Sequence, residues 1–269
     1  MKKFPQTLKK KIEKHNFSVQ GKSVYKKILS GDKEEISLDN KIENNIFVHV
    51  DSCAQLNLSG SVEDAVFVLE KNAVVNYLCK EKNKSKVQKK ISVIVGAGAK
   101  FNLTSSVLDN VGSNCKMIFI LDGVNAVVNI EEAISAVSFA ETDHDILISH
   151  FFHDTESNYF ARVMVDDSAK VGIKVKTIIA KKASKSIAHQ HIDNLIISDN
   201  AVVKGWPQLE INNDDVVCTH ALTSGHLNEE EVFYANSRGI GKKGALGMIA
   251  EGFLQPIESK FADVKNEII

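Results

Sequence analysis

Apolar and polar residues alternate in short runs over most of this chain, between about residue 36 and residue 220. Alternation with a period of two is typical of β-strands that have one buried face. Small clusters of turn residues, such as Gly96-Ala97-Gly98 and Asp122-Gly123, separate the runs. Amphipathic segments long enough for a helix are nearly absent between these limits. The pattern therefore predicts many short strands.

Many of the runs begin at an alanine that is followed by alternating apolar residues. The intervals between these alanines are 19, 26, 27, 43 and 32 residues, which lie largely in the range of solenoid turns. A small residue at the same corner of each turn would let stacked coils bury a continuous apolar interior. We therefore predict a parallel β-helix over residues 36–226. A β-sandwich is the rival fold, but its hairpin turns would be tighter and more regular. The alanines are Ala54, Ala73, Ala99, Ala126, Ala169 and Ala201.

The N-terminal end differs from this middle. Residues 5–15 and 22–29 have weak helical patterns with lysine-rich faces. Residues 1–35 are therefore predicted to form a short N-terminal helical cap on the β-helix.

Residues 227–269 are predicted to form a C-terminal helical region. Its first helix begins after Asn228, a favourable N-cap residue, and Glu231 stands where it would complete a capping box. Gly239 suits the left-handed position that ends a helix. A second helix is predicted from Lys242 to Phe253, and the proline that follows at position 256 is expected to stop it.

Composition and charge restrict the function. The chain has 269 residues, 43% of them hydrophobic, and a formal net charge of −1, so no global field favours nucleic acid or an anionic membrane. The basic N-terminus lacks the apolar core of a signal peptide, and no apolar run is long enough to span a bilayer. A cytoplasmic protein with reduced thiols is expected, because its four cysteines lie far apart in sequence.

Two histidine-containing pairs are candidates for metal chemistry. Cys218 and His220 are two residues apart, so on one strand both side chains face the same way and can share a metal or the edge of a cluster. His189 and His191 have the same spacing, with Gln190 between them. Spacing alone is more typical of a core thiol, a hydrogen-bonded imidazole and a polar rim, because strong metal motifs have more ligands.

A denser group of titratable residues lies between residues 144 and 156. A hydrolase can use such carboxylates and imidazoles, but their spacing matches no recognised catalytic motif, and solvated loops explain them more simply. The chain also lacks a Walker-type phosphate loop and a Gly-x-Ser-x-Gly elbow, so intrinsic ATPase activity is not expected. The residues are His144, Asp145, His150, His153, Asp154 and Glu156.

The C-terminal half resembles a known family. Its motifs look like the signature of the SufB/SufD family of iron–sulfur cluster assembly proteins, over about residues 150–256; before residue 150 only the β-helix-like pattern agrees. The motifs are Ala188-His189-Gln190, Asn194 to Asp199, Pro207 to Ile211, Asp214-Asp215-Val216, Cys218-Thr219-His220-Ala221, Gly225-His226-Leu227, Glu229-Glu230, Phe233-Tyr234 and Ser237-Arg238-Gly239-Ile240.

Within this family the chain is more similar to SufD than to SufB. Its Cys-x-His pair is followed by Ala221, whereas SufB-like chains tend to have Glu after the histidine. At the position where SufB-like chains carry a cluster-assembly cysteine just before an aspartate, this chain has Ile192 before Asp193. It therefore lacks that thiolate.

The resemblance implies a right-handed parallel β-helix that pairs through its core with a SufB-like subunit. His220, with Cys218 beside it, would lie at this interface, where iron or a transient iron–sulfur cluster is held; no cofactor would be tightly bound. The chain would be a non-catalytic scaffold, and ATP hydrolysis would belong to a SufC-like ATPase bound by the C-terminal helices. The residues implied for that contact are Glu229, Glu230, Phe233, Tyr234, Arg238, Gly239 and Ile240.

The chain also departs from the family. Members are usually longer, with a larger N-terminal helical region, and often have acidic residues where this chain has Gly241-Lys242-Lys243-Gly244. Two other functions stay open. One is a self-pairing scaffold that binds a cluster alone, as a homodimer; the other is a carbohydrate-active β-helix enzyme, which the single Trp and the missing signal peptide disfavour.

Overall fold

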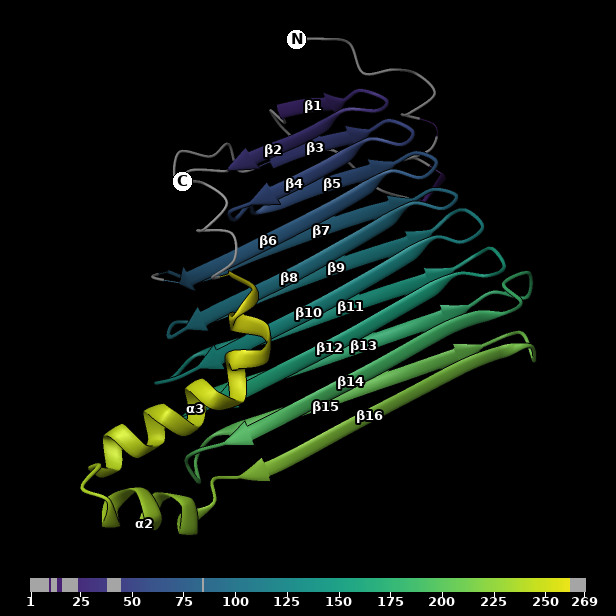
Figure 1. The fold of residues 1–269 in the computed structure, drawn as a ribbon. Coiled ribbons are helices and arrows are strands. Elements are labelled where there is room, and N and C mark those ends of the chain that lie inside the picture. Colours follow the sequence, from purple (N-terminus) through teal and green to yellow (C-terminus); the bar gives the residue numbers. More distant parts are fainter. Residues whose placement is uncertain (1–9, 11–13, 16–23, 38–44, 84, 262–269) are drawn as a thin grey trace.

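In a computed structural model the chain forms two parallel β-sheets that face each other, followed by two helices (Figure 1). The structure describes residues 10, 14–15, 24–37, 45–83 and 85–261. Successive strands alternate between the two sheets, so the backbone winds as a solenoid whose neighbouring strands are parallel. The structure thus confirms the predicted parallel β-helix.

Each sheet has eight strands in the described part of the chain. The odd-strand sheet contains, in spatial order, β1 (Val24–Ile28), β3 (Asn45–Val50), β5 (Asp64–Leu69), β7 (Val87–Val95), β9 (Ser113–Leu121), β11 (Glu141–His150), β13 (Lys170–Ile179) and β15 (Val202–Ile211). The even-strand sheet contains β2 (Lys33–Ser37), β4 (Gln55–Ser59), β6 (Val74–Asn83), β8 (Lys100–Asp109), β10 (Val127–Ala136), β12 (Glu156–Val165), β14 (Ser186–Ile196) and β16 (Val216–His226). The helices are α2 (Glu229–Ser237) and α3 (Lys242–Glu258).

The core lies between the two sheets, because every second residue of a strand points inward. In β12 and β13 the inward residues are buried and most of the alternating outward ones are partly or fully exposed. Aromatic rings fill part of this interior: the centroid of the Phe101 ring lies 5.2 Å from that of Phe67 and 5.9 Å from that of Phe119. Burial of these rings, together with the many aliphatic side chains around them, is the main favourable term that holds the sheets together.

The alanines that led to the fold prediction are all buried, but they lie at two corners rather than one. Ala126 and its three predecessors occupy turns from the odd-strand to the even-strand sheet, whereas Ala169 and Ala201 occupy turns at the opposite end. The long interval between Ala126 and Ala169 reflects this change of end. In both places the alanine amide closes the turn; Ala99 N donates to Gly96 O at 3.1 Å and Ala169 N to Asp166 O at 3.1 Å.

A ladder of asparagine side chains runs along the outer face of the even-strand sheet. From the second member onward, each Nδ2 donates to the Oδ1 of the asparagine one turn earlier, at 2.7–3.0 Å. Because each residue is in register with the next, the ladder fixes the stacking of five consecutive turns. Its members are Asn57, Asn76, Asn102, Asn129 and Asn158.

The solenoid begins earlier than the sequence pattern predicts. Residues 22–29 were expected to be helical, but Val24–Ile28 is strand β1, and the predicted boundary at residue 36 falls within β2. These two short strands form the first edge of the stack among the described residues, and they carry charged residues, as edge strands often do. Their sequence pattern therefore resembles that of a polar surface helix. Most of the helix expected over residues 5–15 lies outside the described residues.

The C-terminal helices follow β16 directly. The side chain of Asn228 accepts a hydrogen bond from Glu230 N, and Gly239 has φ 85°, as expected for the two ends of α2. The second helix, however, continues through Pro256 to Glu258. Its last turns contribute buried Leu254 and Ile257 to an apolar cluster on the even-strand sheet, and this contact outweighs the hydrogen bond that proline removes. No helix of the described residues is long and apolar enough to cross a membrane.

Candidate functional site

The last turn of the solenoid, formed by β15 and β16, is open. Within the part of the chain that the structure describes, each of these strands has a hydrogen-bonded neighbour in its sheet on one side only, so the other side presents backbone N–H and C=O groups (Figure 1). Large apolar side chains are exposed there: Trp206 is 49% exposed, Val217 57% and Leu222 43%. Apolar residues on an open sheet edge are typical of a surface that pairs with another chain.

The first turn of the solenoid has a different composition. Its strands β1 and β2 carry Lys26, Lys27, Lys33 and Glu34, and the Lys26 Nζ lies 2.9 Å from a Glu34 carboxylate oxygen. Charged side chains on an edge strand disfavour pairing, because association would remove them from water. The two ends of the stack therefore differ in composition.

Cys218 and His220 lie on β16 and face the space between the two sheets. Their register partners on β14 are Ala188 and Gln190, both buried inside the solenoid. Cys218 is half-buried against the apolar cluster of Ala188, and burial raises the pKa of its thiol. His220 is exposed at the open end.

The residues beneath His220 are held in place. The Gln190 Nε2 donates to Thr177 Oγ1 at 2.7 Å and also approaches Gln208 O at 3.2 Å. These bonds join β14 to β13 and β15 across the interior. They fix the polar side chain of Gln190, which lies next to His220 on the neighbouring strand.

The Cys218–His220 pair is an incomplete ligand set. Among the described residues, no group of three or more His, Cys, Asp or Glu side chains is placed to hold a metal ion. Iron in proteins accepts both thiolate and imidazole ligands, commonly four around each site. Two donors at an open strand edge suit a metal or cluster that a second chain helps to hold.

The pair His189 and His191 lies on the outer face of β14, away from Cys218. The His189 Nδ1 is 2.6 Å from Thr219 Oγ1, and the His191 Nε2 is 2.7 Å from Asp193 Oδ1. Burial alone would raise the pKa of Asp193. Hydrogen bonds from Thr223 and His191 have the larger effect, so the pKa of Asp193 lies below its usual value. These contacts make a polar rim beside the terminal turn.

The titratable group between residues 144 and 156 does not converge. His144 points into the interior, where its Nδ1 lies 3.1 Å from Glu132 Oε1, and His150 is buried between the hydroxyls of Thr155 and Ser157. His153, by contrast, pairs with its neighbour in an exposed turn. Alternation along β11 and the turn that follows it separate these side chains.

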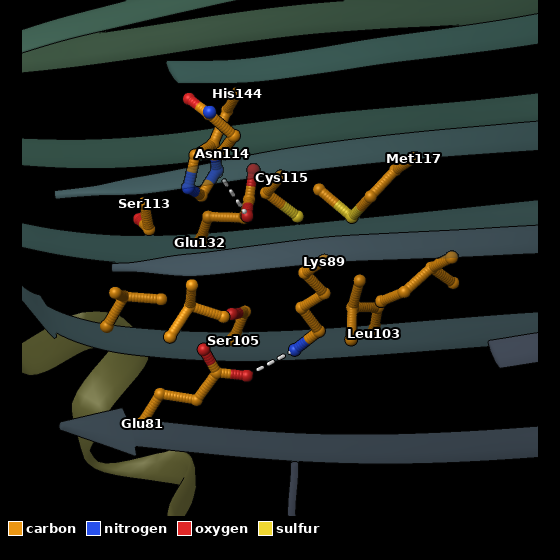
Figure 2. A pocket seen from close by; sticks show the side chains of 13 residues that line it. Glu81, Lys89, Leu103, Ser105, Ser113, Asn114, Cys115, Met117, Glu132 and His144 are labelled. Carbon is orange, nitrogen blue, oxygen red and sulfur yellow. Dashed lines mark hydrogen bonds and ion pairs between the residues drawn. The ribbon is translucent and has the colours of Figure 1, made fainter. Parts of the chain in front are cut away.

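Sequence reasoning missed a polar cluster inside the solenoid (Figure 2). Lys89 and Glu81 form a buried ion pair, and Cys79 lies beside both. A cavity of about 10 Å³ separates this group from Glu132 and His144, which is close to the space one water molecule needs. The available signal was the presence of charged residues at inward positions of β6, β7 and β10.

The predicted ATPase-binding residues lie on α2 and at its end. Phe233 is 74% exposed and Tyr234 61%, while the first turn is acidic through Glu229 and Glu230. The guanidinium of Arg238 lies 5.2 Å from the centre of the Tyr234 ring. Two more residues, Gly239 and Ile240, form the turn into α3, where the Ile240 amide donates to Ala235 O at 3.0 Å.

Helix α3 fastens this hairpin to the solenoid. It lies across the outer face of the even-strand sheet, against β8, β10 and β12 (Figure 1). Arg162 Nη1 donates to Phe253 O at 2.6 Å, and Lys80 Nζ donates to Glu258 Oε2 at 2.7 Å. The exposed face of α2 is thus held at the end of the stack, next to β16.

Comparison with known proteins shows similarity to iron–sulfur cluster assembly proteins. A family model described as SUF system FeS cluster assembly, SufBD core domain, matches residues 33–253. The iron-sulfur cluster assembly protein SufD of Escherichia coli (strain K12) is 29% identical over 151 residues, 55% of this chain and 36% of that protein. SufD of Bacillus subtilis (strain 168) is 32% identical over 124 residues, 45% of this chain and 28% of that protein.

An iron-sulfur cluster assembly SufBD family protein of Pyrococcus horikoshii is 32% identical over 95 residues, 35% of this chain and 21% of that protein. The chain therefore matches less than two thirds of the length of each of these relatives.

Proposed function

The chain belongs to the SUF system FeS cluster assembly family that has the SufBD core domain, and from this premise we propose that it acts as a SufD-like scaffold subunit. In this proposal its terminal turn pairs with a SufB-like chain, and its C-terminal helices bind a SufC-like ATPase. The observation that carries the proposal is the open, apolar terminal turn with Cys218 and His220 on its edge strand.

Pairing through the terminal turn has a clear physical basis. A partner strand aligned with β15 or β16 would satisfy the open backbone groups, and its side chains would cover Trp206, Val217 and Leu222. Each fully covered apolar side chain of this size contributes about 1.5–3 kcal/mol. The charged edge at β1 and β2 directs the partner to the other end of the stack.

The Cys218–His220 pair would supply part of a shared assembly site, with the nascent cluster as cargo. A thiolate and a neutral imidazole both donate to iron. Because burial keeps Cys218 protonated in the isolated chain, its thiolate forms as metal binds and displaces the proton. The partner chain completes the ligand set.

The α2–α3 hairpin would dock the ATPase. Phe233 and Tyr234 are exposed aromatic side chains of the type that anchors protein interfaces, and Glu229 and Glu230 beside them favour a basic partner surface. ATP hydrolysis is assigned to that partner and no catalytic step to this chain. Movement of the ATPase would reach the solenoid through α3.

The assembly role of His220 is tested in a strain whose cluster maturation depends on this protein. The His220→Ala variant should lose cluster assembly while it still copurifies with the SufB-like chain, because only the ligand is removed. His226→Ala is the matched control, since His226 is an exposed histidine at the end of the same strand. Intact maturation in the His220→Ala strain would show that the proposed site is wrong.

Pairing is tested with charge substitutions. Val217→Lys with Leu222→Lys should abolish copurification with the SufB-like chain, whereas Phe139→Lys, an exposed apolar residue in the turn before β11, should not. If both variants copurify equally, the terminal turn is not the interface. Copurification with a second tagged copy, and stoichiometric iron and sulfide on the isolated protein, would instead indicate a self-pairing scaffold.

Docking of the ATPase is tested separately. Phe233→Ala with Tyr234→Ala should weaken binding of the SufC-like ATPase at least tenfold, since two aromatic anchors are removed. Leu29→Ala serves as the control, because Leu29 is an exposed apolar residue that follows β1 at the other end of the stack. Equal affinities of the two variants would exclude α2 as the docking surface.

A further inference from the structure

Three reactive groups meet inside the solenoid at β6 and β7. The Lys89 Nζ donates to Cys79 Sγ at 2.8 Å, and the Cys79 thiol donates to Glu81 Oε1 at 3.0 Å. The same carboxylate oxygen forms the ion pair with Lys89, which Figure 2 shows as a dashed line. Amine, thiol and carboxylate thus form a closed triangle that joins the two sheets.

The surroundings bury this triangle between the two sheets. Cys79 is fully buried, and Lys89 is almost fully buried with its Nζ 6.0 Å from the centre of the Tyr77 ring. The Ser61 hydroxyl donates to Glu81 Oε1 at 2.5 Å. Desolvation raises the pKa of Cys79 to about 11, so the sulfur carries its proton. The small cavity beside Lys89 and Glu81 leaves one side open to a small reactant.

We propose that Cys79 and Lys89 are a modification site, at which molecular oxygen joins the sulfur to the amine nitrogen through one bridging oxygen atom. The 2.8 Å between Nζ and Sγ is a separation that a single bridging atom spans without moving either strand. Molecular oxygen is small and apolar, so it can enter a buried site. This proposal does not depend on the function proposed above.

The reaction balances with the groups that the site supplies. The Cys79 thiol, the Lys89 ammonium, the Glu81 carboxylate and one O₂ give an S–O–NH link, a protonated Glu81 and one water. The S–H bond, two N–H bonds and the O–O bond of O₂ break. One S–O bond, one N–O bond, one O–H bond on Glu81 and the two O–H bonds of water form. Sulfur and nitrogen each lose two electrons, and the two oxygen atoms accept all four.

The role of Glu81 follows from this balance. It accepts the proton that the ammonium must lose before the nitrogen can react. The ion pair is then replaced by neutral groups, which removes two charges from a low-dielectric interior where charges are costly. Among the described residues, Cys79 is the cysteine that has both a lysine amine and a carboxylate at hydrogen-bond distance.

The test is intact-mass spectrometry of the full chain, prepared either without oxygen or with exposure to air. The aerobic sample should gain the mass of one oxygen atom less two hydrogen atoms, and peptide mapping should find Cys79 and Lys89 linked. Cys79→Ser and Lys89→Arg should abolish the gain. Cys115→Ser, which changes another buried cysteine near the same cavity, should retain it.

Each other outcome overturns the proposal. A gain of one whole oxygen atom at Cys79 indicates a sulfenic acid, and a loss of two hydrogen atoms with Cys79 joined to another cysteine indicates a disulfide. An unchanged mass after exposure to air shows that the site does not react. Since the wild-type chain alone decides between these results, the test holds even if a variant fails to fold.

Discussion

A buried histidine makes the stability of this protein depend on pH. The His150 side chain is fully buried, with Nδ1 2.8 Å from Thr155 Oγ1 and Nε2 2.8 Å from Ser157 Oγ. Burial lowers its pKa from 6.5 to about 4. That difference corresponds to about 3 kcal/mol between the folded and the unfolded chain.

The direction of the effect follows from proton binding. Between pH 6.5 and about 4 the unfolded chain holds a proton on His150 that the folded chain does not. The free energy of unfolding is therefore fully retained above pH 6.5 and falls as the pH falls through this window. By pH 4.5 about 2.5 kcal/mol should be lost through this one residue.

The comparison variant is His150→Gln, whose amide can still bond to both hydroxyls but does not titrate. It should be less stable than the wild type at pH 7 by about 1–2 kcal/mol, because its hydrogen bonds are less well matched. That gap should close and reverse as the pH falls to 4.5, as measured by urea unfolding. Ser157→Ala, which keeps the imidazole, should retain the pH dependence. Parallel curves for the wild type and His150→Gln would refute burial of the imidazole as the cause.

Three further changes test the fold. Phe101→Ala should lower the free energy of unfolding by about 3–5 kcal/mol, since its ring contacts aromatic rings on β5 and β9 of the opposite sheet. Phe139→Ala at the surface should change it by less than about 0.5 kcal/mol in the same urea assay. Asn102→Ala interrupts the outer ladder at two hydrogen bonds and should cost about 1–3 kcal/mol; equal hydrogen exchange in the flanking strands of variant and wild type would contradict it. Gly239→Ala should destabilise the helical hairpin by about 1 kcal/mol because φ is 85°, whereas Gly247→Ala in α3 should stabilise it by a similar amount, and amide exchange of the helices distinguishes the two signs.

Much of the fold was accessible from the sequence because a solenoid repeats one local rule. Period-two alternation gave the strands, and buried alanines such as Ala99 and Ala126 marked the turns. The same rule put Cys218 and His220 on one face of one strand, and the register with β14 agrees. The N-cap at Asn228 was equally local, since it depends on a few consecutive residues.

The rest depends on contacts that no local pattern contains. Ala169 lies at the opposite end of the solenoid from Ala126. The sequence pattern does not show this, because the turns at both ends use the same small residue and the spacing of the alanines does not distinguish the two ends. The triangle of Cys79, Glu81 and Lys89 forms only after two strands from different sheets are placed face to face. For the same reason, charged residues near one another in sequence can face opposite ways.

The position of α3 determines what a force on the helical hairpin would do. If α3 were attached only to β16, movement of a partner bound to α2 would peel off the last strand. Instead, α3 crosses β8, β10 and β12, and the bond from Arg162 to Phe253 O and the pair of Lys80 with Glu258 tie it to separate turns of the stack. A load on α2 is therefore shared among several strands. The terminal turn can then move as part of a rigid body, which keeps Cys218 and His220 in register while the surface they present changes its orientation toward a partner.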